Sequence, residues 1–525
     1  MKSILQSCPR LLTLLCWLTC LAFHGIITLP SIGYPGLAMD EGMVLTYPSL
    51  ISNGMVPQRD FETLYPPGNI WLLSAAYKFF GTNIFVERYV ALGYHMLLIT
   101  GLFFLLRRQS RQTAMAGCFL TTMISTHLMC VAFAWIGAMS FAVCALAVIS
   151  GTGMERWRSV CAGILCALSL TWRADLAPAF ILGFGSYFYL GSYPKNGIKL
   201  FFLGASAGFI PLFIHVCQVG PVIFCDSVFW TPVIRLHGTR TLALDKSQAQ
   251  IGELYTLMML SVFLAIFAGW KKFASTGATT EKRKQSLILL CAGLFCLGAL
   301  SQGLHRLDST HICFLAILAL PWGVMGLVHL SQWFLTPVSA LVGAIILCPQ
   351  TYDNAKGRLV ELNNPEIARR MVGTIGSASR PFPMSISPLS KSYRDVFEKM
   401  KMLSKPGETL FVGGSDLRFA YGNDVCFYYL LPWLVPASYF VELNPLSANR
   451  ENSSLCNDLP GADWLILNTI WKSTENNKSQ IPGPNLPNQI VQEHFKLVYK
   501  SGPIGIFHNL ASEKPEQSLP AINQN

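Results

Sequence analysis

Residues 11–29, LLTLLCWLTCLAFHGIITL, form an apolar run that follows the basic residues Lys2 and Arg10. A helix needs about 20 mostly apolar residues to cross a lipid bilayer, so the run predicts a first membrane span. It is too long for the apolar core of a typical cleaved signal peptide, and no small-x-small cleavage pattern follows it. We therefore expect this segment to remain as a transmembrane helix.

Ten further apolar runs predict an α-helical polytopic membrane protein with about eleven transmembrane helices. The chain has 525 residues, of which 52% are hydrophobic and 13% charged, and its mean hydropathy is +0.42. Soluble domains carry about 25% charged residues, and disordered chains are poor in apolar residues, so both classes are excluded. The segment 68–80 is too short to cross and is expected at the interface or as an extension of the second span. The ten runs lie at about 83–106, 113–133, 135–151, 159–173, 176–193, 198–217, 252–270, 286–304, 310–330 and 335–349.

The charge pattern gives these spans an orientation. With the N-terminus in the cytoplasm, the inside segments carry 14 basic and two acidic residues, whereas the outside loops before residue 351 carry eight basic and ten acidic residues. Cytoplasmic loops of membrane proteins are enriched in Lys and Arg, which supports this orientation. The net charge of +11 therefore reflects the orientation of the spans in the membrane. It gives no support to nucleic-acid binding.

Eleven spans from a cytoplasmic start leave residues 351–525 outside the cell. We predict two domains, a transmembrane domain over 1–350 and a small soluble α/β domain over 351–525. Residues 409–412 and 464–467 predict buried strands, residues 391–404 predict a helix, and residues 428–440 predict a buried strand and turn. Cys426 and Cys456 lie in this domain, and the sequence leaves open whether they form a disulfide.

Charged residues at the outer ends of the spans are the candidate functional groups, because ionisable side chains near the hydrocarbon are costly. In the first external loop, Asp40 and Glu41 directly follow the first span and a Pro/Gly-rich turn. Residues 41–52 predict an amphipathic helix on the membrane surface. The acidic pair at its N-terminus could serve chemistry, or it could simply interact with the helix dipole.

Two more outer-face clusters each place an Arg and an Asp two residues apart. One is TWRAD at 171–175, at the end of the fifth span, and the other is HRLDSTH at 305–311, between the ninth and tenth spans. A guanidinium suits phosphate in geometry and charge. The alternative is a local ion pair that anchors a helix end. The residues concerned are Arg173, Asp175, Arg306, Asp308 and His311.

The first external loop resembles that of the GT-C membrane glycosyltransferases. The resemblance is to bacterial members that use polyprenyl-phosphate sugars and are related to protein O-mannosyltransferases and aminoarabinose transferases. It covers about 30 residues, and outside them the similarity is one of topology. It implies a multi-pass protein of the bacterial plasma membrane with its site on the outer face. The pattern comprises Met39-Asp40-Glu41-Gly42, Gly54-x-x-Pro57-x-x-Asp60-Phe61 and Tyr65-Pro66-Pro67-Gly68.

The resemblance also implies a reaction, in which a hexosyl or pentosyl group moves from a polyprenyl-phosphate donor to an acceptor hydroxyl. The acceptor could be a glycolipid, a polysaccharide or a protein, and membrane lipid is a further partner. Asp40 is our candidate base, although either acid of the doublet could act. Glu41 would support it through a divalent cation (Mg²⁺ or Mn²⁺) bound by both carboxylates, through the acceptor or through a hydrogen bond.

For the donor phosphate, the resemblance implies a role for Arg306, Asp308 and His311. Arg306 is the first candidate for phosphate binding, Arg173 the second and Arg59 the third. Asp308 or Asp175 would hold the guanidinium in place. The predicted substrate-binding set is Arg59, Asp60, Tyr65, Arg173, Asp175, Arg306, Asp308 and His311.

Two other functions remain open at this stage. A transporter or lipid flippase would explain the spans but not the acidic first loop, and it would be favoured by paired broken helices in matching halves, which the sequence does not show. A non-catalytic relative that acts in cell-envelope assembly is the second alternative. The sequence has no GxGxxG, Walker or HExxH motif, which disfavours a nucleotide-sugar donor.

Overall fold

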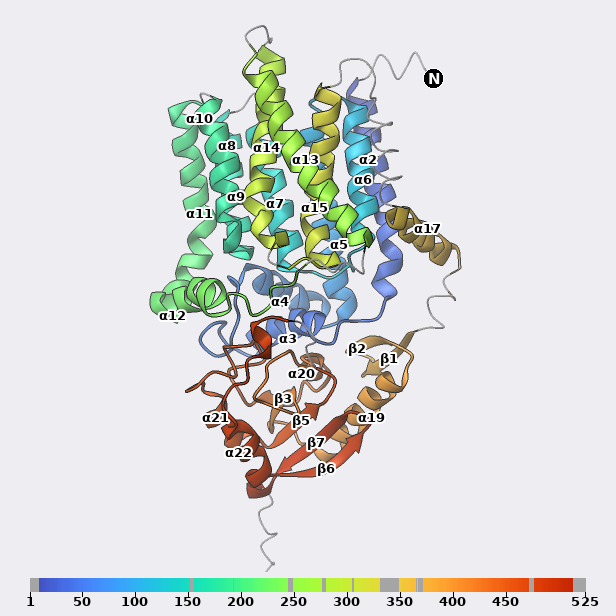
Figure 1. Ribbon diagram of the computed structural model, residues 1–525, viewed down its shortest axis with the longest axis vertical. Coiled ribbons are helices and arrows are strands. Elements are labelled where there is room, and N and C mark those ends of the chain that lie inside the picture. The colour runs from blue at the N-terminus through green and yellow to red at the C-terminus, as the bar shows by residue number, and fades with distance from the viewer. Residues whose placement is uncertain are drawn as a thin grey trace, which may run out of the picture. The chain divides into compact units, whose positions relative to one another are not determined.

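A computed structural model of the chain falls into two compact units (Figure 1). The helical unit comprises Met1–Pro35, Tyr47–Arg59 and Thr63–Val372, and the sheet unit comprises Gly36–Thr46, Asp60–Glu62 and Gly373–Asn525. The structure describes residues 9–151, 155–191, 193–243, 249–275, 280–304, 306–330, 349–364, 366, 372–471 and 476–512.

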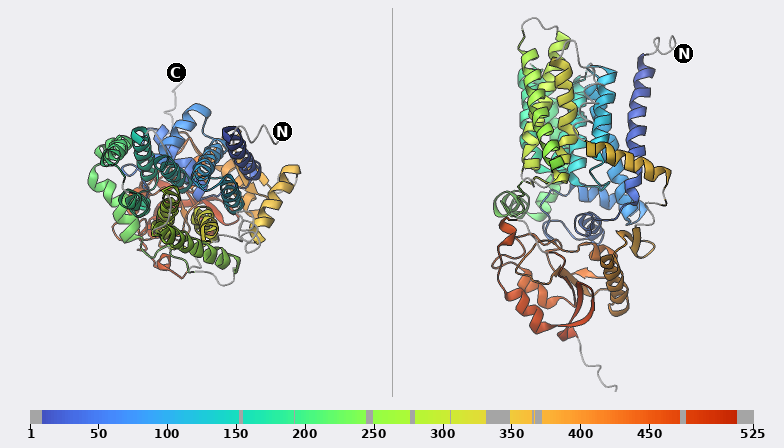
Figure 2. Two further views of the ribbon diagram at one scale, coloured as in Figure 1. Left: turned by 90° about the horizontal axis from the view of Figure 1, so that it is seen from above. Right: turned by 45° about the vertical axis from the view of Figure 1, so that its right-hand side comes forward.

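Long helices that run side by side form most of the helical unit, while α12 and α17 lie across the others (Figure 2). Helix α3 (Asp40–Ser52) begins in the sheet unit and ends in the helical unit. Four short 3-10 or π segments join or extend the helices: η1 (Leu29–Gly33), η2 (Ala174–Leu176), η3 (Ile181–Gly185) and η4 (Asp226–Arg235). The other helices are α2 (Pro9–Thr28), α4 (Gly68–Phe80), α5 (Ile84–Leu106), α6 (Arg111–Ser125), α7 (Ala134–Ile149), α8 (Glu155–Trp172), α9 (Ala177–Phe180), α10 (Ser186–Leu190), α11 (Lys195–Val219), α12 (Pro221–Cys225), α13 (Ala249–Phe273), α14 (Thr280–Leu304), α15 (Ser309–Leu330) and α17 (Pro349–Asn363).

Each of the ten predicted spans before residue 331 coincides with a helix or a helical series in this structure. The span expected at 335–349 falls outside the described residues, apart from Pro349, which begins α17. Six described helices are long and apolar enough to cross a bilayer by themselves: Pro9–Gly33, Ile84–Leu106, Lys195–Val219, Gly252–Phe273, Thr280–Leu300 and Ser309–Leu330. The fold class is thus confirmed, while the number of crossings and the domain boundary at residue 350 stay predictions.

Two local expectations, those for α6 and α3, need correction, and the alternatives left open for residues 68–80 are narrowed to one. Helix α6 ends at Ser125, well before the predicted limit of 133, because a turn follows it. Helix α4 is a separate helix rather than an extension of the second span. It ends at Gly81, whose φ of 85° is not helical. Helix α3 forms where a helix was predicted, but Leu45 and Leu50 are buried, so these side chains pack inside the protein and do not face lipid.

Helices α8 and α11 pack with their backbones in close contact. A Cβ atom added to Gly204 would lie 2.1 Å from the Val160 carbonyl oxygen, and one added to Gly163 would lie 2.0 Å from the Phe201 carbonyl oxygen. Only glycine fits at these two positions. Small residues at helix interfaces allow this approach in membranes, where packing rather than hydrophobic burial drives association.

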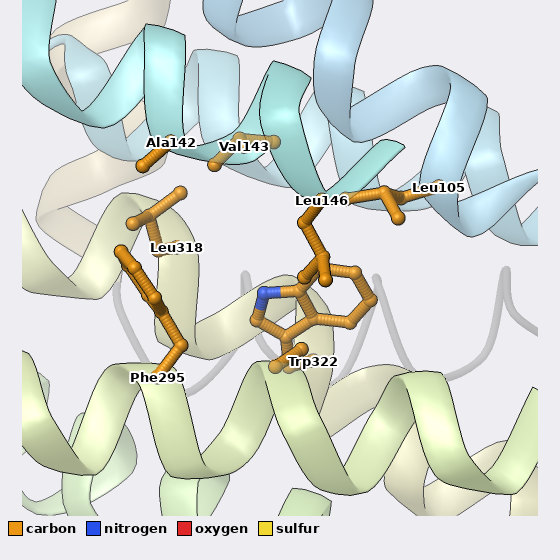
Figure 3. Close-up of a pocket in the computed structure, with 8 residues that line it drawn as sticks. Leu105, Ala142, Val143, Leu146, Phe295, Leu318 and Trp322 are labelled. Carbon is orange, nitrogen blue, oxygen red and sulfur yellow. The ribbon is translucent and has the colours of Figure 1, made fainter. Parts of the chain in front are cut away.

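Apolar side chains fill the centre of the bundle. Figure 3 shows the small gap between α5, α7, α14 and α15, lined among others by Leu105, Leu146, Phe295 and Trp322. Its volume is about 10 Å³, which is close to the minimum for one water molecule. The gap is therefore a packing defect and not a binding site.

A five-stranded sheet forms the core of the sheet unit, with the strand order β4-β3-β5-β7-β6. β3 pairs in parallel with β4 and β5, and β7 pairs antiparallel with β5 and β6. The elements are β1 (Val372–Gly376), β2 (Pro381–Ser385), α19 (Pro388–Leu403), β3 (Thr409–Gly414), α20 (Cys426–Leu430), β4 (Val435–Pro436), α21 (Leu455–Asp458), η5 (Leu459–Gly461), β5 (Trp464–Asn468), η6 (Lys478–Gln480), α22 (Leu486–His494), β6 (Phe495–Ser501), β7 (Ile504–Asn509) and η7 (Leu510–Ser512).

The sheet unit confirms the predicted strands at 409–412 and 464–467 and the predicted helix at 391–404. Helix α19 buries Tyr393, Val396, Phe397 and Met400, which is the i, i+3, i+4, i+7 spacing of an amphipathic helix. Residues 428–440 differ from the expected strand and turn, because they begin inside the buried helix α20 and reach only the two-residue strand β4. Cys426 and Cys456 are both free thiols.

Candidate active site

Arg173 and Asp175 form a two-point ion pair at the end of α8. The Arg173 Nε and Nη2 atoms donate to the two Asp175 carboxylate oxygens at 3.0 and 2.5 Å. The Arg173 guanidinium also lies over the Tyr65 ring, with its carbon 4.2 Å from the ring centroid. The structure therefore brings together three of the predicted site residues from two distant parts of the sequence.

The residues around this cluster explain why the two motifs meet. A Cβ atom added to Gly68 would lie 2.4 Å from the Trp172 ring, so the Pro-Pro-Gly turn packs directly against the residue before Arg173. Trp172 Nε1 donates to the Tyr94 hydroxyl at 3.0 Å, and this hydroxyl donates to Asn69 Oδ1 at 2.7 Å. The Tyr65–Asn69 turn and the end of α8 thus form one packed unit.

Asp308 organises the second Arg-x-Asp cluster. One of its oxygens accepts a hydrogen bond from Arg306 Nε at 2.6 Å, and the other accepts the backbone N–H of His311 at 2.9 Å. His311 Nδ1 lies 2.9 Å from Asp308 Oδ1. Burial opposes ionisation of Asp308, but the hydrogen bonds from His311 and Arg306 outweigh it and lower its pKa to about 2.

The loop over residues 220–243, which follows α11, contacts this second cluster. Leu307 N donates to the Leu242 carbonyl at 3.2 Å, and Arg306 Nη1 donates to the Arg240 carbonyl at 3.3 Å. A second ion pair inside the loop joins Arg235 Nη1 to Asp226 Oδ2 at 2.7 Å. At least part of the loop is therefore a structural support for the Arg306 backbone and side chain.

Arg59 is exposed, and its neighbour Gln58 holds the loop in shape. Gln58 has a positive φ of 62° and is 1% exposed. Its amide nitrogen donates to the Tyr65 carbonyl at 2.8 Å, and its amide oxygen lies 2.7 Å from His215 Nε2 of α11. The role of Gln58 was not predicted, because no sequence pattern marks an isolated polar residue that supports a loop.

Two buried charges of α5 were also missed. Arg88 is 0% exposed, and its Nη1 donates to the carbonyls of Ile32 and Tyr34 at 2.7 Å each. Its neighbour Glu87 is also 0% exposed and accepts the backbone N–H of Ala132. Arg88 thus ties the chain that follows the first span to α5, and Glu87 ties the segment after α6 to the same helix. A charged pair near the start of an apolar run is the signal that could have revealed them.

Asp40 and Glu41 occur in the sheet unit and differ in their surroundings. Asp40 begins α3 and is exposed, whereas Glu41 is 0% exposed and its Oε2 accepts the Leu37 N–H at 3.1 Å. Glu41 therefore closes the turn that precedes the helix. Because the doublet and the two arginine clusters belong to different units, their convergence in one cavity stays a prediction.

The C-terminal part of the sheet unit holds the acidic loop through its backbone. Gly36 N donates to the Pro383 carbonyl at 2.7 Å, and Cys426 N donates to the Ala38 carbonyl at 2.9 Å. A Cβ atom added to Gly42 would lie 2.5 Å from Cys426 N. The glycine of the Met-Asp-Glu-Gly motif is thus needed for the close approach of α3 to residues 425–426.

Asp60 and Glu62 lie in a second segment of the first external loop that belongs to the sheet unit. Asp60 is partly exposed, whereas Glu62 is 6% exposed and accepts hydrogen bonds from Asn444 Nδ2 at 3.2 Å and from the Ser447 hydroxyl. Burial raises the pKa of the Glu62 carboxyl to about 7, although these two hydrogen bonds favour its charged form.

This raised pKa leads to a prediction for stability. Between about pH 4.5 and pH 7 the folded chain holds a proton on Glu62 that the unfolded chain releases, so the stability from this group falls as the pH rises. Glu62→Gln cannot ionise and keeps an acceptor for Ser447. Each pKa unit corresponds to about 1.4 kcal/mol. We therefore expect the Tm of the variant relative to wild type to rise by about 5 °C from pH 5 to pH 8.

Thermal unfolding of the detergent-purified protein across this pH range measures the effect. Glu451→Gln changes an exposed carboxylate of the same unit and is the matched control, for which we expect no pH-dependent difference. An identical Tm difference for Glu62→Gln at pH 5 and pH 8 would contradict the assignment.

The solved structures that resemble this chain include two of ArnT from Cupriavidus metallidurans. The structure described as bound to undecaprenyl phosphate has a TM-score of 0.51 and 11% identity, covering 95% of this chain and 98% of that chain. The apo structure has a TM-score of 0.53 and 12% identity, covering 93% of this chain and 96% of that chain. Neither a family model nor a curated protein sequence matches the chain. At this identity the likeness establishes the fold over nearly the whole length.

Proposed function

We propose that this chain, which has the GT-C fold of ArnT, transfers a sugar from a polyprenyl-phosphate donor to an acceptor hydroxyl at the extracytoplasmic face of the membrane. One observation carries the proposal beyond the fold. Tyr65 of the first-loop motif lies against Arg173 of the second motif, beside a Gly68–Trp172 contact that admits no side chain at residue 68. Two sequence patterns chosen for their chemistry therefore pack against each other, which supports a shared site.

In the proposed reaction, Asp40 takes the proton of the acceptor hydroxyl as its oxygen attacks the anomeric carbon. The bond from that carbon to the donor phosphate breaks, its electron pair stays on the phosphate oxygen, and polyprenyl phosphate leaves. The configuration at the anomeric carbon is inverted, because attack comes from the face opposite the phosphate. Exposure of Asp40 supports this role, whereas burial of Glu41 and its bond to Leu37 N–H fit a residue that positions the loop.

The leaving phosphate gathers negative charge, and arginine is suited to stabilise it. Arg306 is the first candidate, and Asp308 orients its guanidinium through the 2.6 Å hydrogen bond. Arg173, oriented by Asp175 and Tyr65, is the second candidate. Arg59 is the third, and its exposure leaves it able to reach a ligand. His311 would donate to the phosphate or hold Asp308.

Asp40 and Glu41 would hold a divalent cation, Mg²⁺ or Mn²⁺, and the cation would offset negative charge on the donor phosphate. Among the described residues, no group of three or more His, Cys, Asp or Glu side chains could hold a metal ion. Mg²⁺ commonly binds one or two carboxylates and completes its shell with water and substrate phosphates. The doublet fits such a site only when the donor is present. EDTA in an in vitro transfer reaction tests for this dependence.

The proposed function predicts a specific chemical loss in cells without the gene. We expect a glycolipid, a surface polysaccharide or a glycoprotein to become lighter by one hexose or pentose unit, because the donor sugar is no longer transferred. Mass spectrometry of glycolipids and glycoproteins from cells with and without the gene measures this change and identifies the acceptor class.

The same comparison separates the alternatives. Unchanged glycans together with a defect in lipid translocation would contradict the proposal and favour a flippase. A glycan loss that is restored equally well by a variant with both acids of the doublet neutralised would favour a non-catalytic assembly partner.

A further inference from the structure

A large cationic cavity lies in the helical unit near the start of α2 and the end of α5. Helix α2 starts at the upper end of the bundle in Figure 1. Its volume is about 1130 Å³, and its walls come from α2, α5, α6, α7, α8 and α14. The charge pattern of the sequence assigns this end of the bundle to the cytoplasm. Five arginines and one acid line the cavity: Arg10, Arg107, Arg108, Arg111, Arg158 and Glu281.

This cavity is separate from the candidate active site. Helix α14 begins at Thr280, next to the cavity residue Glu281, and ends at Leu304, two residues before Arg306. An α-helix rises 1.5 Å per residue, so its two ends are about 36 Å apart. The cavity therefore cannot be a part of the Arg306 cluster.

The arginines of the cavity have unused hydrogen-bonding capacity. Arg108 Nε and Arg111 Nη1 are buried and have no hydrogen-bond partner within the described part of the chain. No ion pair to an acid is found for any of the five arginines among the described residues, although Arg108 Nη2 donates to the Ala147 carbonyl at 3.2 Å. A buried donor without a partner destabilises the folded protein, and more so if it is charged. An anion in the cavity would remove this cost.

Burial also acts on the charge of Arg108. Burial is the largest cause of the lowered pKa of the Arg108 guanidinium. The nearby charges of Arg158 and Arg107 also lower this pKa. The backbone makes room for this cluster, because a Cβ atom on Gly151 would lie 1.2 Å from Arg158 Nη1. Cytoplasmic arginines that only set topology need neither burial nor such a fitted position.

The cavity also has an apolar wall that continues along α2 and α5. Trp17 and Phe104 place their ring centroids 5.9 Å apart, and the Arg107 guanidinium lies 5.3 Å from the centroid of Phe104. Leu14 lines the cavity too and is 45% exposed on α2. A free inorganic anion gains nothing from contact with this apolar wall, whereas a lipid would place its chains against it.

We propose that this cavity binds the phosphate headgroup of a membrane lipid, with the lipid chains along α2 and α5. Basic pockets between transmembrane helices on the cytoplasmic side are suited to anionic headgroups. The guanidinium groups of Arg108 and Arg111 bind the phosphate oxygens, and Trp17 and Phe104 contact the chains. A glycerophospholipid and a polyprenyl phosphate share this chemistry and are distinguished by experiment.

Native mass spectrometry of the full-length protein in detergent tests the proposal with four probes: phosphatidylglycerol, undecaprenyl phosphate, diacylglycerol and inorganic phosphate. We expect one of the two lipid phosphates to remain bound at one molecule per chain at this site, and diacylglycerol and inorganic phosphate not to remain bound. The double variant Arg108→Ala/Arg111→Ala should weaken that binding at least 10-fold. If undecaprenyl phosphate binds at two equivalents per chain, one of them at the proposed donor site, only the equivalent in this cavity should be lost in the double variant.

Arg283→Ala/Lys284→Ala is the matched control, because both residues are exposed cations near the start of the same helix as Glu281 and do not line the cavity. Equal weakening by the control would show non-specific attraction and overturn the proposal, as would retention of inorganic phosphate as strong as that of the lipids. If the arginine variant does not fold, the Tm of wild type decides. A rise with a lipid phosphate but not with diacylglycerol supports the site, and no rise overturns it.

Discussion

Asp40→Asn is expected to lower the rate of sugar transfer by a factor of about 10² to 10⁴, the range that a general base contributes. The amide keeps the size of the side chain but cannot accept the proton of the acceptor hydroxyl. Asp40 is exposed at the start of α3, so the substitution should leave folding and membrane insertion intact. Transfer of labelled sugar in membranes, normalised to the amount of inserted protein, measures the effect.

Two variants make this prediction specific. Glu451→Gln removes an exposed carboxylate elsewhere in the sheet unit and should leave transfer at the wild-type rate. Glu41→Gln should lower the Tm or the amount of folded protein more than Asp40→Asn does, because Glu41 is buried and bonded to the Leu37 N–H. Full activity of Asp40→Asn, or a loss of activity confined to a well-folded Glu41→Gln, would remove Asp40 from the role of base.

Arg306→Ala should reduce transfer by a factor of about 10² to 10³, the loss typical when one donor to a developing anion is removed. The reason is that the leaving phosphate loses the guanidinium that Asp308 orients. Arg306→Lys keeps the positive charge but loses the paired N–H donors of the guanidinium, so it should recover only part of the activity. Steady-state kinetics with a purified polyprenyl-phosphate sugar measure kcat and KM for each variant.

The alternative for Arg306 is a purely structural ion pair at the start of α15. Arg235→Ala removes a comparable pair, Arg235–Asp226, whose two side chains are 32% and 42% exposed, against 27% and 30% for Arg306–Asp308. We expect both alanine variants to change the Tm by a similar small amount, and only Arg306→Ala to lower kcat strongly. Parallel losses of activity in the two variants would assign Arg306 to structure alone.

The helical fold could be predicted because crossing a bilayer imposes a simple pattern on the sequence. An apolar run of about 20 residues has few alternatives to a helix in lipid, so helices such as α5 and α15 appear close to their predicted limits. The ends of the helices were predicted less accurately where a turn interrupts the apolar run, as it does after Ser125. The pattern also cannot reveal close backbone contacts such as Gly163 with Phe201, which depend on how two helices cross.

The candidate site was predictable only in part, for a different reason. The ion pairs Arg173–Asp175 and Arg306–Asp308 follow from residues two apart, so local spacing is sufficient. The contact of Tyr65 with Arg173 joins residues more than 100 positions apart, and no periodicity encodes it. Buried supporting residues such as Glu62 depend on partners from remote loops, which a single sequence does not specify.

The hydrogen bonds of Gly36 and Ala38 with Pro383 and Cys426 have a consequence for biogenesis. The acidic loop leaves the ribosome early, but its backbone partners are synthesised more than 300 residues later. The loop must therefore wait for these partners until the chain has been translated at least as far as Cys426. Ordering of the acidic loop is thus tied to synthesis of the later part of the sheet unit, so a product released by the ribosome before residue 383 would lack both hydrogen bonds.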